Sequence, residues 1–280
     1  MNVVRYLTAL ATVIISFSLQ LLAAERIVSF APGITDIVIS LGKGNELVGI
    51  TDYCIVPDEY KKIPRVGGFL DANYERLITL KPTIVLLYDE NVKLKEFLES
   101  RFIRIVAVRH ATLSDIYTSI NDIGFALNVS DKAAELNQTM HKKLLEIAMR
   151  HPGYTNRKNV MIVVGRDKGT LQNMYIVGKG DFLEELLSIM NAENAYEGQI
   201  QYPKVSAESV MHMNPDVIIE FLQDMVRTHG KDAVKKDWQQ YARIPAVKNG
   251  RVYEADPDYA LFPSPRIVDI ALMLERFIYD

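Results

Sequence analysis

Cysteine is nearly absent from this sequence: Cys54 is the single cysteine among 280 residues. One cysteine cannot form a disulfide within the chain, so disulfide cross-links contribute nothing to its stability. A buried thiol that packs as a small apolar side chain is the simplest interpretation of Cys54, and we prefer it to metal ligation.

Histidines are few and scattered. The five are His110, His141, His151, His212 and His229, and none forms a close pair with the spacing of metal ligands. A dedicated site for bare zinc or manganese is therefore not expected. His110, at the end of a predicted strand, is a candidate axial ligand to haem iron or cobalt, but a surface or hydrogen-bonded histidine is the simpler interpretation.

The motifs of several enzyme classes are also missing. The chain has no zincin helix, no Gly-x-Ser-x-Gly elbow and no Gly-Lys-Ser/Thr phosphate-binding loop. The Gly-x-Gly fragments at 42–44 and 178–180 most simply form turns. We therefore expect no enzyme activity.

The chain has no excess of positive charge. Its 32 lysines and arginines face 35 acidic residues, which gives a formal charge of -3. A nucleic-acid-binding protein needs a basic face that replaces counterions, so nucleic acid is not an expected partner. Asp232 and Asp237 interrupt the basic stretch at 227–251, and we interpret that stretch as a solvated helix face.

The first 24 residues have the pattern of a signal peptide. Arg5 precedes an uncharged run at 6–22, and Ala23 and Ala24 come before the charged Glu25. A retained anchor helix is the alternative, because the run approaches the roughly 20 residues that span a bilayer. We prefer cleavage after Ala24. Since no cysteine lies near that point, we expect a soluble periplasmic protein without a lipid anchor.

After the signal peptide, short β-type runs alternate with helix-type segments, which predicts α/β structure built on parallel strands. The clearest strands of the first set lie at 26–30, 47–50, 83–88 and 103–108. Those of the second set lie at 159–164, 216–221 and 251–255. The sequence therefore predicts two doubly wound α/β lobes, at 25–129 and 152–280.

One long helix is expected to join the lobes, as a connector at 130–151. The stretch 130–150 has no glycine or proline, and its apolar residues recur at helical spacing. Ser130 is a suitable N-cap, and His151, Pro152 and Gly153 end the run. Because bending a continuous helix disrupts its hydrogen bonds, we expect no large hinge closure on ligand binding.

A weak internal repeat relates the two lobes. Residues 73–85 match 206–218 in pattern: a capping residue, a glutamate two positions later, a short helix that ends near a proline, and then a strand. Each lobe thus presents one equivalent glutamate at a helix start, Glu75 in the first and Glu208 in the second.

Taken together, these residues resemble one family, the substrate-binding proteins of ABC importers for vitamin B12, iron siderophores and haem. The resemblance covers nearly all of the mature chain. The matching stretches, each weak alone but specific in their order and spacing, are 26–32, 47–53, 63–69, 73–82, 178–187, 202–206, 214–218, 244–253 and 264–267. Within the family, the sequence is most similar to the cobalamin-binding members.

The resemblance implies a monomer in the periplasm that delivers a chelated metal to a permease dimer in the inner membrane. Corrinoids such as cobalamin are the expected ligands, with cobinamide, haem and ferric siderophores left open, and no cofactor is expected. In the family, glutamates that match Glu75 and Glu208 meet arginines on the two permease subunits. A signalling protein on the same fold is the alternative.

A ligand between the lobes would meet the loops at the carboxyl ends of the parallel strands. Aromatic faces there suit a flat macrocycle, and arginines pair with carboxylate or phosphate groups of a chelate. The candidates for ligand contact are Tyr53, Phe69, Tyr88, Arg166, Tyr175, Tyr259, Phe262 and Arg266. Cobalamin-binding relatives tend to have tryptophan at some positions aligned with Phe69 and Tyr259, whereas Trp238, the single tryptophan here, is predicted in a surface helix. Arg266 has a structural alternative at the start of the last helix.

Overall fold

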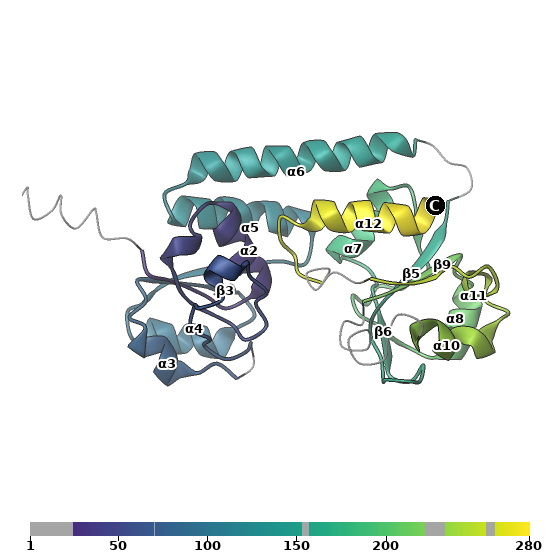
Figure 1. Cartoon of the computed structure of the whole chain (residues 1–280), viewed down its shortest axis with the longest axis horizontal. Helices are drawn as coiled ribbons and strands as arrows, with labels where there is room; N and C mark the ends of the chain where they lie inside the picture. Colours follow the sequence, from purple (N-terminus) through teal and green to yellow (C-terminus); the bar gives the residue numbers. More distant parts are fainter. Residues whose placement is uncertain (1–24, 70, 153–156, 222–232, 256–260) are drawn as a thin grey trace, which may run out of the picture.

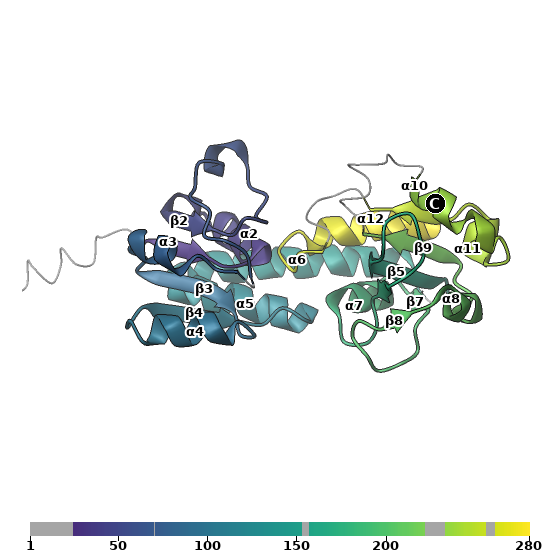
Figure 2. The ribbon, with the colours of Figure 1, turned by 90° about the horizontal axis from the view of Figure 1, so that it is seen from below.

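The computed structural model describes residues 25–69, 71–152, 157–221, 233–255 and 261–280. It consists of two α/β lobes joined by one long helix, α6 (Ser130–Arg150), which runs along one side of both (Figure 1). In the view from below, the lobes lie side by side along the length of this helix (Figure 2). The predicted signal peptide at 1–24 lies outside the described residues.

The N-terminal lobe is built on a four-stranded parallel sheet of order β2-β1-β3-β4. Its strands are β1 (Ile27–Ser29), β2 (Leu47–Ile50), β3 (Ile84–Tyr88) and β4 (Arg104–Val108). Its helices are α2 (Pro32–Ser40), α3 (Tyr74–Thr79), α4 (Val92–Glu99) and α5 (Leu113–Ala126), with single turns at Gly44–Glu46 and Asp58–Tyr60. The central strands are apolar and buried on both faces, as parallel strands with helices on both sides must be.

The C-terminal lobe has a six-stranded mixed sheet, of order β10-β9-β5-β6-β8, with β7 beside β5. Its strands are β5 (Asn159–Gly165), β6 (Met174–Ile176), β7 (Glu193–Asn194), β8 (Lys204–Val205), β9 (Val217–Glu220) and β10 (Val252–Glu254). Its helices are α7 (Phe182–Ile189), α8 (Ala207–Met213), α10 (Ala233–Trp238), α11 (Pro245–Lys248) and α12 (Ile267–Tyr279), with a single turn, η3, at Gln239–Tyr241.

The seven predicted strands are all present to within a residue or two at each end. The prediction missed β6, β7 and β8, which have only two or three residues each. Of these, β6 runs antiparallel to β5, and β8 runs antiparallel to β6. The two-residue strands β7 and β8 are too short to show an alternation of polar and apolar residues, so periodicity cannot reveal them.

The connecting helix spans the predicted residues 130–150, but its cap differs from the prediction. Val129 occupies the N-cap position without a side-chain cap, and Ser130 is already helical. One face of α6 buries Ala133, Met140, Leu144 and Ile147. These side chains belong to an apolar core that continues from the N-terminal lobe through α5 and α6 to α7 and α12.

The apolar core beneath α6 contains side chains from both lobes, so the lobes are packed together. Beside it, α12 lies along α6, and the Glu275 carboxylate of α12 accepts from Arg150 and contacts His151, both at 2.8 Å. None of the helices in the described ranges has the length and apolar character needed to cross a membrane.

Candidate functional site

The C-terminal lobe has a mainly apolar cavity of about 380 Å³. It lies where β5 ends and α7 begins, next to the short strand β6. The residues that line it are Val164, Gly165, Tyr175, Phe182, Leu183, Tyr202 and Leu261. Tyr175 is 43% exposed and Tyr202 is 45% exposed. Aromatic rings left open to solvent beside a cavity are suited to stacking against a flat ligand.

Tyr202 is held in place by a buried carboxylate. Its hydroxyl donates a hydrogen bond to Asp181, which also caps α7 by accepting from the Leu183 N–H at 2.9 Å. Burial raises the pKa of Asp181, and the Tyr202 hydroxyl and Leu183 N–H oppose that rise. Burial and the nearby Asp181 charge raise the pKa of Tyr202 above its ordinary value. Tyr202 therefore presents a neutral phenol at neutral pH.

The N-terminal lobe exposes two aromatic side chains, Tyr53 and Phe69, which are 67% and 39% exposed. The two lie close together, since a Cβ placed on Gly68 would come within 2.9 Å of the Tyr53 ring. The Asn91 side chain donates to the Phe69 carbonyl at 3.4 Å, and the Asn91 N–H donates to the Tyr88 carbonyl at 3.0 Å. These contacts connect the two exposed rings with the carboxyl end of β3.

Tyr88 lies deeper, where the lobes meet. Its ring stacks on His110 with 3.8 Å between ring centroids, and burial raises its pKa above the ordinary value. A Cβ on Gly33 would come within 2.8 Å of the Tyr88 hydroxyl and 2.4 Å of the Pro263 carbonyl. The two lobes therefore approach each other closely here, and glycine is the residue that leaves room for the contact.

Hydrogen bonds join the lobes beside this point. The Phe182 N–H donates to the Ala111 carbonyl at 2.7 Å, and the Leu113 N–H donates to the Glu185 carboxylate at 2.6 Å. His110 and Ala111 thus lie next to Asp181 and Phe182, so the Tyr88 side of the N-terminal lobe meets the C-terminal lobe at the start of α7. Of the predicted ligand residues, Tyr175 lines the cavity, and Phe262 is a half-buried neighbour of Leu261 in the chain. Tyr88 lies at the contact between the lobes, and Tyr53 and Phe69 are exposed on the N-terminal lobe.

Arg266 forms an ion pair that joins the two lobes. Its guanidinium pairs with the Asp36 carboxylate of α2 at 3.0 Å, and it stands at the N-cap position of α12. Burial raises the pKa of Asp36, and Arg266 and Ser264 oppose that rise. Of the two roles expected for Arg266, the structure shows the structural one.

The guanidinium of Arg166, a predicted ligand contact, is buried and paired with carboxylates. Its side chain is 0% exposed and pairs with Glu220 at 3.0 Å and with Asp237 at 2.9 Å. The Trp238 indole N–H donates to the same Glu220 carboxylate at 2.7 Å. The helix predicted around Trp238 is α10, in which Lys235 and Lys236 are exposed. Trp238 itself is completely buried, because its indole packs into the apolar core beside this ion network.

Tyr259 lies outside the described residues. The five cavity side chains that were missed are Val164, Phe182, Leu183, Tyr202 and Leu261. Of these, the sequence around Phe182, Leu183 and Tyr202 was noted only as part of the family resemblance. Their sequence signal was weak, because Tyr202 precedes a strand of two residues and Phe182 belongs to the apolar face of α7.

Glu75 and Glu208 occupy equivalent places in the two lobes. Each lies in the first turn of a short helix and is exposed, with Asn73 capping α3 and Ser206 capping α8. Hydrogen bonds from its own backbone N–H and from Ser206 lower the pKa of Glu208. Both helices lie on the side of the molecule away from α6 (Figure 1). The geometry places one ionisable carboxylate on that side of each lobe.

Within the described ranges, no group of three histidine, cysteine, aspartate or glutamate side chains could hold a metal ion. The described residues therefore display no preformed site for a bare cation. The rings and the phenol hydroxyl at the cavity can contact a flat ligand.

Comparison with known proteins gives the same architecture. A family model described as periplasmic binding protein matches residues 27–259. The chain belongs to this family. A substrate-binding lipoprotein of an ABC transporter from Bacillus subtilis, YvrC, is 32% identical, and the match covers 91% of this chain and 80% of the relative. The vitamin B12-binding protein of Vibrio cholerae is 26% identical over 88% of this chain and 86% of its own length.

Solved structures of periplasmic binding proteins share the two-lobe fold. The periplasmic haem-binding protein HutB of Vibrio cholerae superposes with a TM-score of 0.82 at 21% identity, covering 92% of this chain and all of the other. The vitamin B12-binding protein BtuF of Vibrio cholerae gives a TM-score of 0.75 at 21% identity, covering 91% and 96%. The expected family and fold class are confirmed.

Proposed function

We propose that this periplasmic binding protein captures a preassembled metal chelate, a corrinoid such as cobalamin, and delivers it to an ABC importer in the inner membrane. The observation that carries the proposal is the apolar cavity of the C-terminal lobe with the partly exposed rings of Tyr175 and Tyr202 in its lining. The N-terminal lobe adds two further exposed rings, Tyr53 and Phe69. The vitamin B12-binding relatives support the choice of a corrinoid.

The protonation state of the Tyr88 and Tyr202 phenols favours a ligand whose metal is already coordinated. Burial raises the pKa of both Tyr88 and Tyr202, which disfavours the phenolate form that would ligate ferric iron. A corrinoid needs stacking and hydrogen bonds from the protein, and neutral tyrosines supply both. We infer that the protein holds the chelate without chemical turnover and carries no cofactor of its own.

Delivery requires a route to the membrane and a docking surface. We infer that the chain is exported through a cleavable signal peptide at 1–24 and acts as a monomer in the periplasm. Glu75 and Glu208 would dock it on the permease dimer, one carboxylate to each subunit. Two separated charges on pseudo-equivalent lobes suit a two-fold symmetric partner, and charge complementarity of this kind acts on encounter and specificity.

The ligand class can be tested with the purified mature protein. Calorimetry and visible spectroscopy with cyanocobalamin, cobinamide, haemin and ferric siderophores should show tight binding of a corrinoid. Binding of haemin or a siderophore alone would replace the corrinoid by another chelate. Tight binding of an amino acid or a sugar, with no chelate bound, would contradict the proposal.

Docking can be tested by changing Glu75 and Glu208 together to alanine. We expect ligand affinity to stay unchanged while uptake into vesicles that contain the importer falls. A matched control is Glu135→Ala with Glu146→Ala, which removes the same charge from exposed positions on α6, on the opposite side of the molecule. Equal uptake by the two double variants would show that the paired glutamates have no docking role.

A further inference from the structure

A buried carboxylate sets the direction of one hydrogen bond at the cavity of the C-terminal lobe. The Tyr202 hydroxyl donates to one oxygen of the Asp181 carboxylate, and the Leu183 N–H donates to the other oxygen at 2.9 Å. Asp181 is only 1% exposed, so water hardly competes for these oxygens. An ionised carboxylate can only accept hydrogen bonds, so the phenol proton stays on the side of Asp181. The Tyr202 oxygen therefore offers lone pairs to a ligand, and no proton.

The oxygen of this phenol lies beside the space for the ligand. Tyr202 lines the cavity together with Phe182 and Leu183, which follow Asp181 directly in the chain. The Tyr202 hydroxyl thus reaches the start of α7, where the lining of the cavity begins, and the residue is still 45% exposed. A hydrogen bond donated to a charged acceptor polarises its donor, which makes the phenol oxygen a stronger acceptor in turn.

The start of α7 does not draw an anion into the cavity. A helix N-terminus favours negative charge, but Asp181 already occupies this one, and Glu184 and Glu185 lie in the first turn. The Phe182 N–H is used as well, since it donates to the Ala111 carbonyl at 2.7 Å. A carboxylate of a ligand would therefore meet a helix start whose positive end is compensated.

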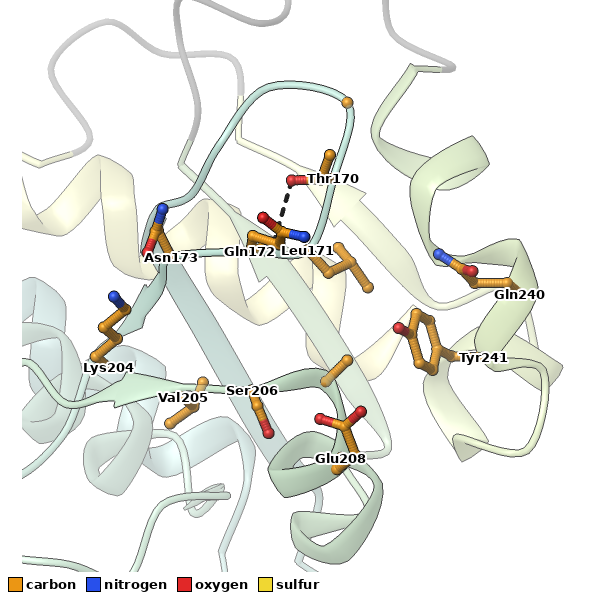
Figure 3. A pocket seen from close by; sticks show the side chains of 12 residues that line it. Thr170, Leu171, Gln172, Asn173, Lys204, Val205, Ser206, Glu208, Gln240 and Tyr241 are labelled. Carbon is orange, nitrogen blue, oxygen red and sulfur yellow. Dashed lines mark hydrogen bonds between the residues drawn. The ribbon is translucent and has the colours of Figure 1, made fainter.

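Basic side chains of the same lobe do not supply positive charge to the cavity. Among the described residues that line the cavity, none is basic. Arg166 is enclosed by carboxylates, and Lys179 pairs with Glu184 at 3.2 Å. Lys204 lines a separate hollow of the lobe, which has a volume of about 780 Å³ and is shown in Figure 3. The cavity therefore has an acceptor and a nearby negative charge, without a cation in its described lining.

His110 is a basic side chain that acts on Asp181. Its ring stacks on Tyr88 at the contact between the lobes, and its Nδ1 lies 3.7 Å from the Glu90 carboxylate. Burial raises the pKa of Asp181, and a positive charge on His110 is among the influences that oppose this rise. Because two carboxylates share His110, it helps to keep Asp181 ionised and leaves no excess of positive charge beside the cavity.

We propose that Asp181, acting through the Tyr202 phenol, makes the cavity select a chelate whose periphery carries neutral amides over a chelate whose periphery carries carboxylates. An amide N–H can donate to the phenol oxygen. A carboxylate can only accept, so it would face the lone pairs of that oxygen and the charge of Asp181 behind them. This inference rests on the proposed capture of a chelate and names the part of the chelate that is recognised. Asp181 is a positioning residue here, because it acts through Tyr202.

The test compares two corrinoids that share one macrocycle and one metal. Cobinamide carries amides around the ring, and cobyrinic acid carries carboxylates in their place. Both would be used in the dicyano form and titrated into the purified mature protein by calorimetry, and the ratio of the two Kd values measures the preference. We expect the wild type to prefer cobinamide by about tenfold or more, which corresponds to ~1.4 kcal/mol. Because the two ligands also differ in net charge, the decisive result is how variants change this ratio.

The variant Asp181→Asn should reverse the hydrogen bond. The Leu183 N–H can only donate, so it holds the oxygen of the new amide on its side and turns the amide N–H group toward Tyr202. The phenol then accepts from position 181 and points its own proton at the ligand. We expect the preference for cobinamide to fall about tenfold or more, and cobyrinic acid to bind more tightly than it binds to the wild type. A variant that merely damaged the structure would bind both ligands more weakly.

Two variants that each remove one phenol hydroxyl from the cavity form a matched pair. Tyr202→Phe removes the fixed acceptor and should weaken the binding of cobinamide by about fivefold to tenfold without improving that of cobyrinic acid. Tyr175→Phe is the control. Tyr175 donates to no carboxylate within the described residues, so its hydroxyl can donate or accept, and the ratio should stay at the wild-type value.

An unchanged ratio in Asp181→Asn overturns the inference, and so does an equal loss of affinity for both ligands. If that variant does not fold, as its melting temperature would show, Tyr202→Phe decides: a ratio equal to that of Tyr175→Phe overturns the inference, and a lower ratio supports it. Equal affinity of the wild type for both corrinoids removes the selection and leaves the capture of a corrinoid standing. If the wild type binds neither corrinoid, the proposed function fails and the inference fails with it.

Discussion

Both lobes bury a cluster of polar groups at the carboxyl ends of the strands of a sheet, but the two clusters differ in charge. In the N-terminal lobe one buried cluster is neutral: the Thr35 hydroxyl donates to the Ser29 hydroxyl at 2.8 Å and contacts the Cys54 thiol at 3.2 Å. In the C-terminal lobe the clustered groups are charged, with Arg166 enclosed by Glu220 and Asp237. Neutral groups cost less to bury, whereas an ion network imposes one geometry and is costly to break.

The largest expected effect is the loss of the charged network. Arg166→Met leaves the Glu220 carboxylate buried without its three hydrogen bonds from the guanidinium, so the free energy of unfolding should fall by about 3–5 kcal/mol. Arg157→Met is the matched control, because its pair with Glu193 is exposed and should contribute about 0–1 kcal/mol. Denaturant unfolding measures both, and similar losses would remove the distinction between buried and exposed pairs.

A smaller effect is expected from the neutral cluster. Thr35→Val keeps the shape of the side chain and leaves the Ser29 hydroxyl and Cys54 thiol short of one partner, which should lower the free energy of unfolding by ~1–3 kcal/mol. The measurement is the same denaturant unfolding. A loss as large as that of Arg166→Met would mean that charge is not what distinguishes the lobes.

The helix caps before Glu75 and Glu208 should contribute almost equally in the two lobes. Asn73 accepts from the Arg76 N–H at 2.9 Å, and Ser206 accepts from the Ser209 N–H at 3.2 Å. Asn73→Ala and Ser206→Ala should each lower the free energy of unfolding by about 1 kcal/mol. Thermal unfolding would compare them. A marked difference would show that the repeat does not place the two helix starts in equivalent surroundings.

The smallest effect is expected for the angle between the lobes. The continuous helix α6 and the shared core beneath it resist bending, so the radius of gyration should hardly change when a chelate binds. Small-angle scattering with and without ligand measures this change. A clear decrease in the radius of gyration would mean that the lobes close as if on a hinge.

The sequence predicted the features that have a period or an order. Seven of the ten strands in the described residues, the helix at 130–150 and the paired starts of α3 and α8 were all visible in the spacing of apolar and capping residues. The cavity of the C-terminal lobe was only partly predicted from the sequence. Tyr175 was predicted, but Tyr202 was not, because its position depends on pairing between β6 and β8, which are too short to show a pattern.

Arg166 and Trp238 show a second limit. An arginine after a strand predicts a ligand contact as readily as a buried ion pair, since what decides between them is the arrival of Glu220 and Asp237 from distant parts of the chain. The same long-range packing buries Trp238 in a helix whose neighbours are charged. No local pattern contains this information.

The central claim is that a chelate is held between aromatic walls from both lobes, and calorimetric titration with cyanocobalamin tests it most directly. Tyr53→Ala and Tyr175→Ala each remove an exposed ring from one wall, and Phe125→Ala removes an exposed ring from α5 that is not among the residues of the cleft. We expect the wild type and Phe125→Ala to bind one corrinoid with equal affinity. Each cleft variant should bind about five- to tenfold more weakly, as the loss of ~1 kcal/mol of stacking implies. Unchanged affinity in both cleft variants would contradict the account.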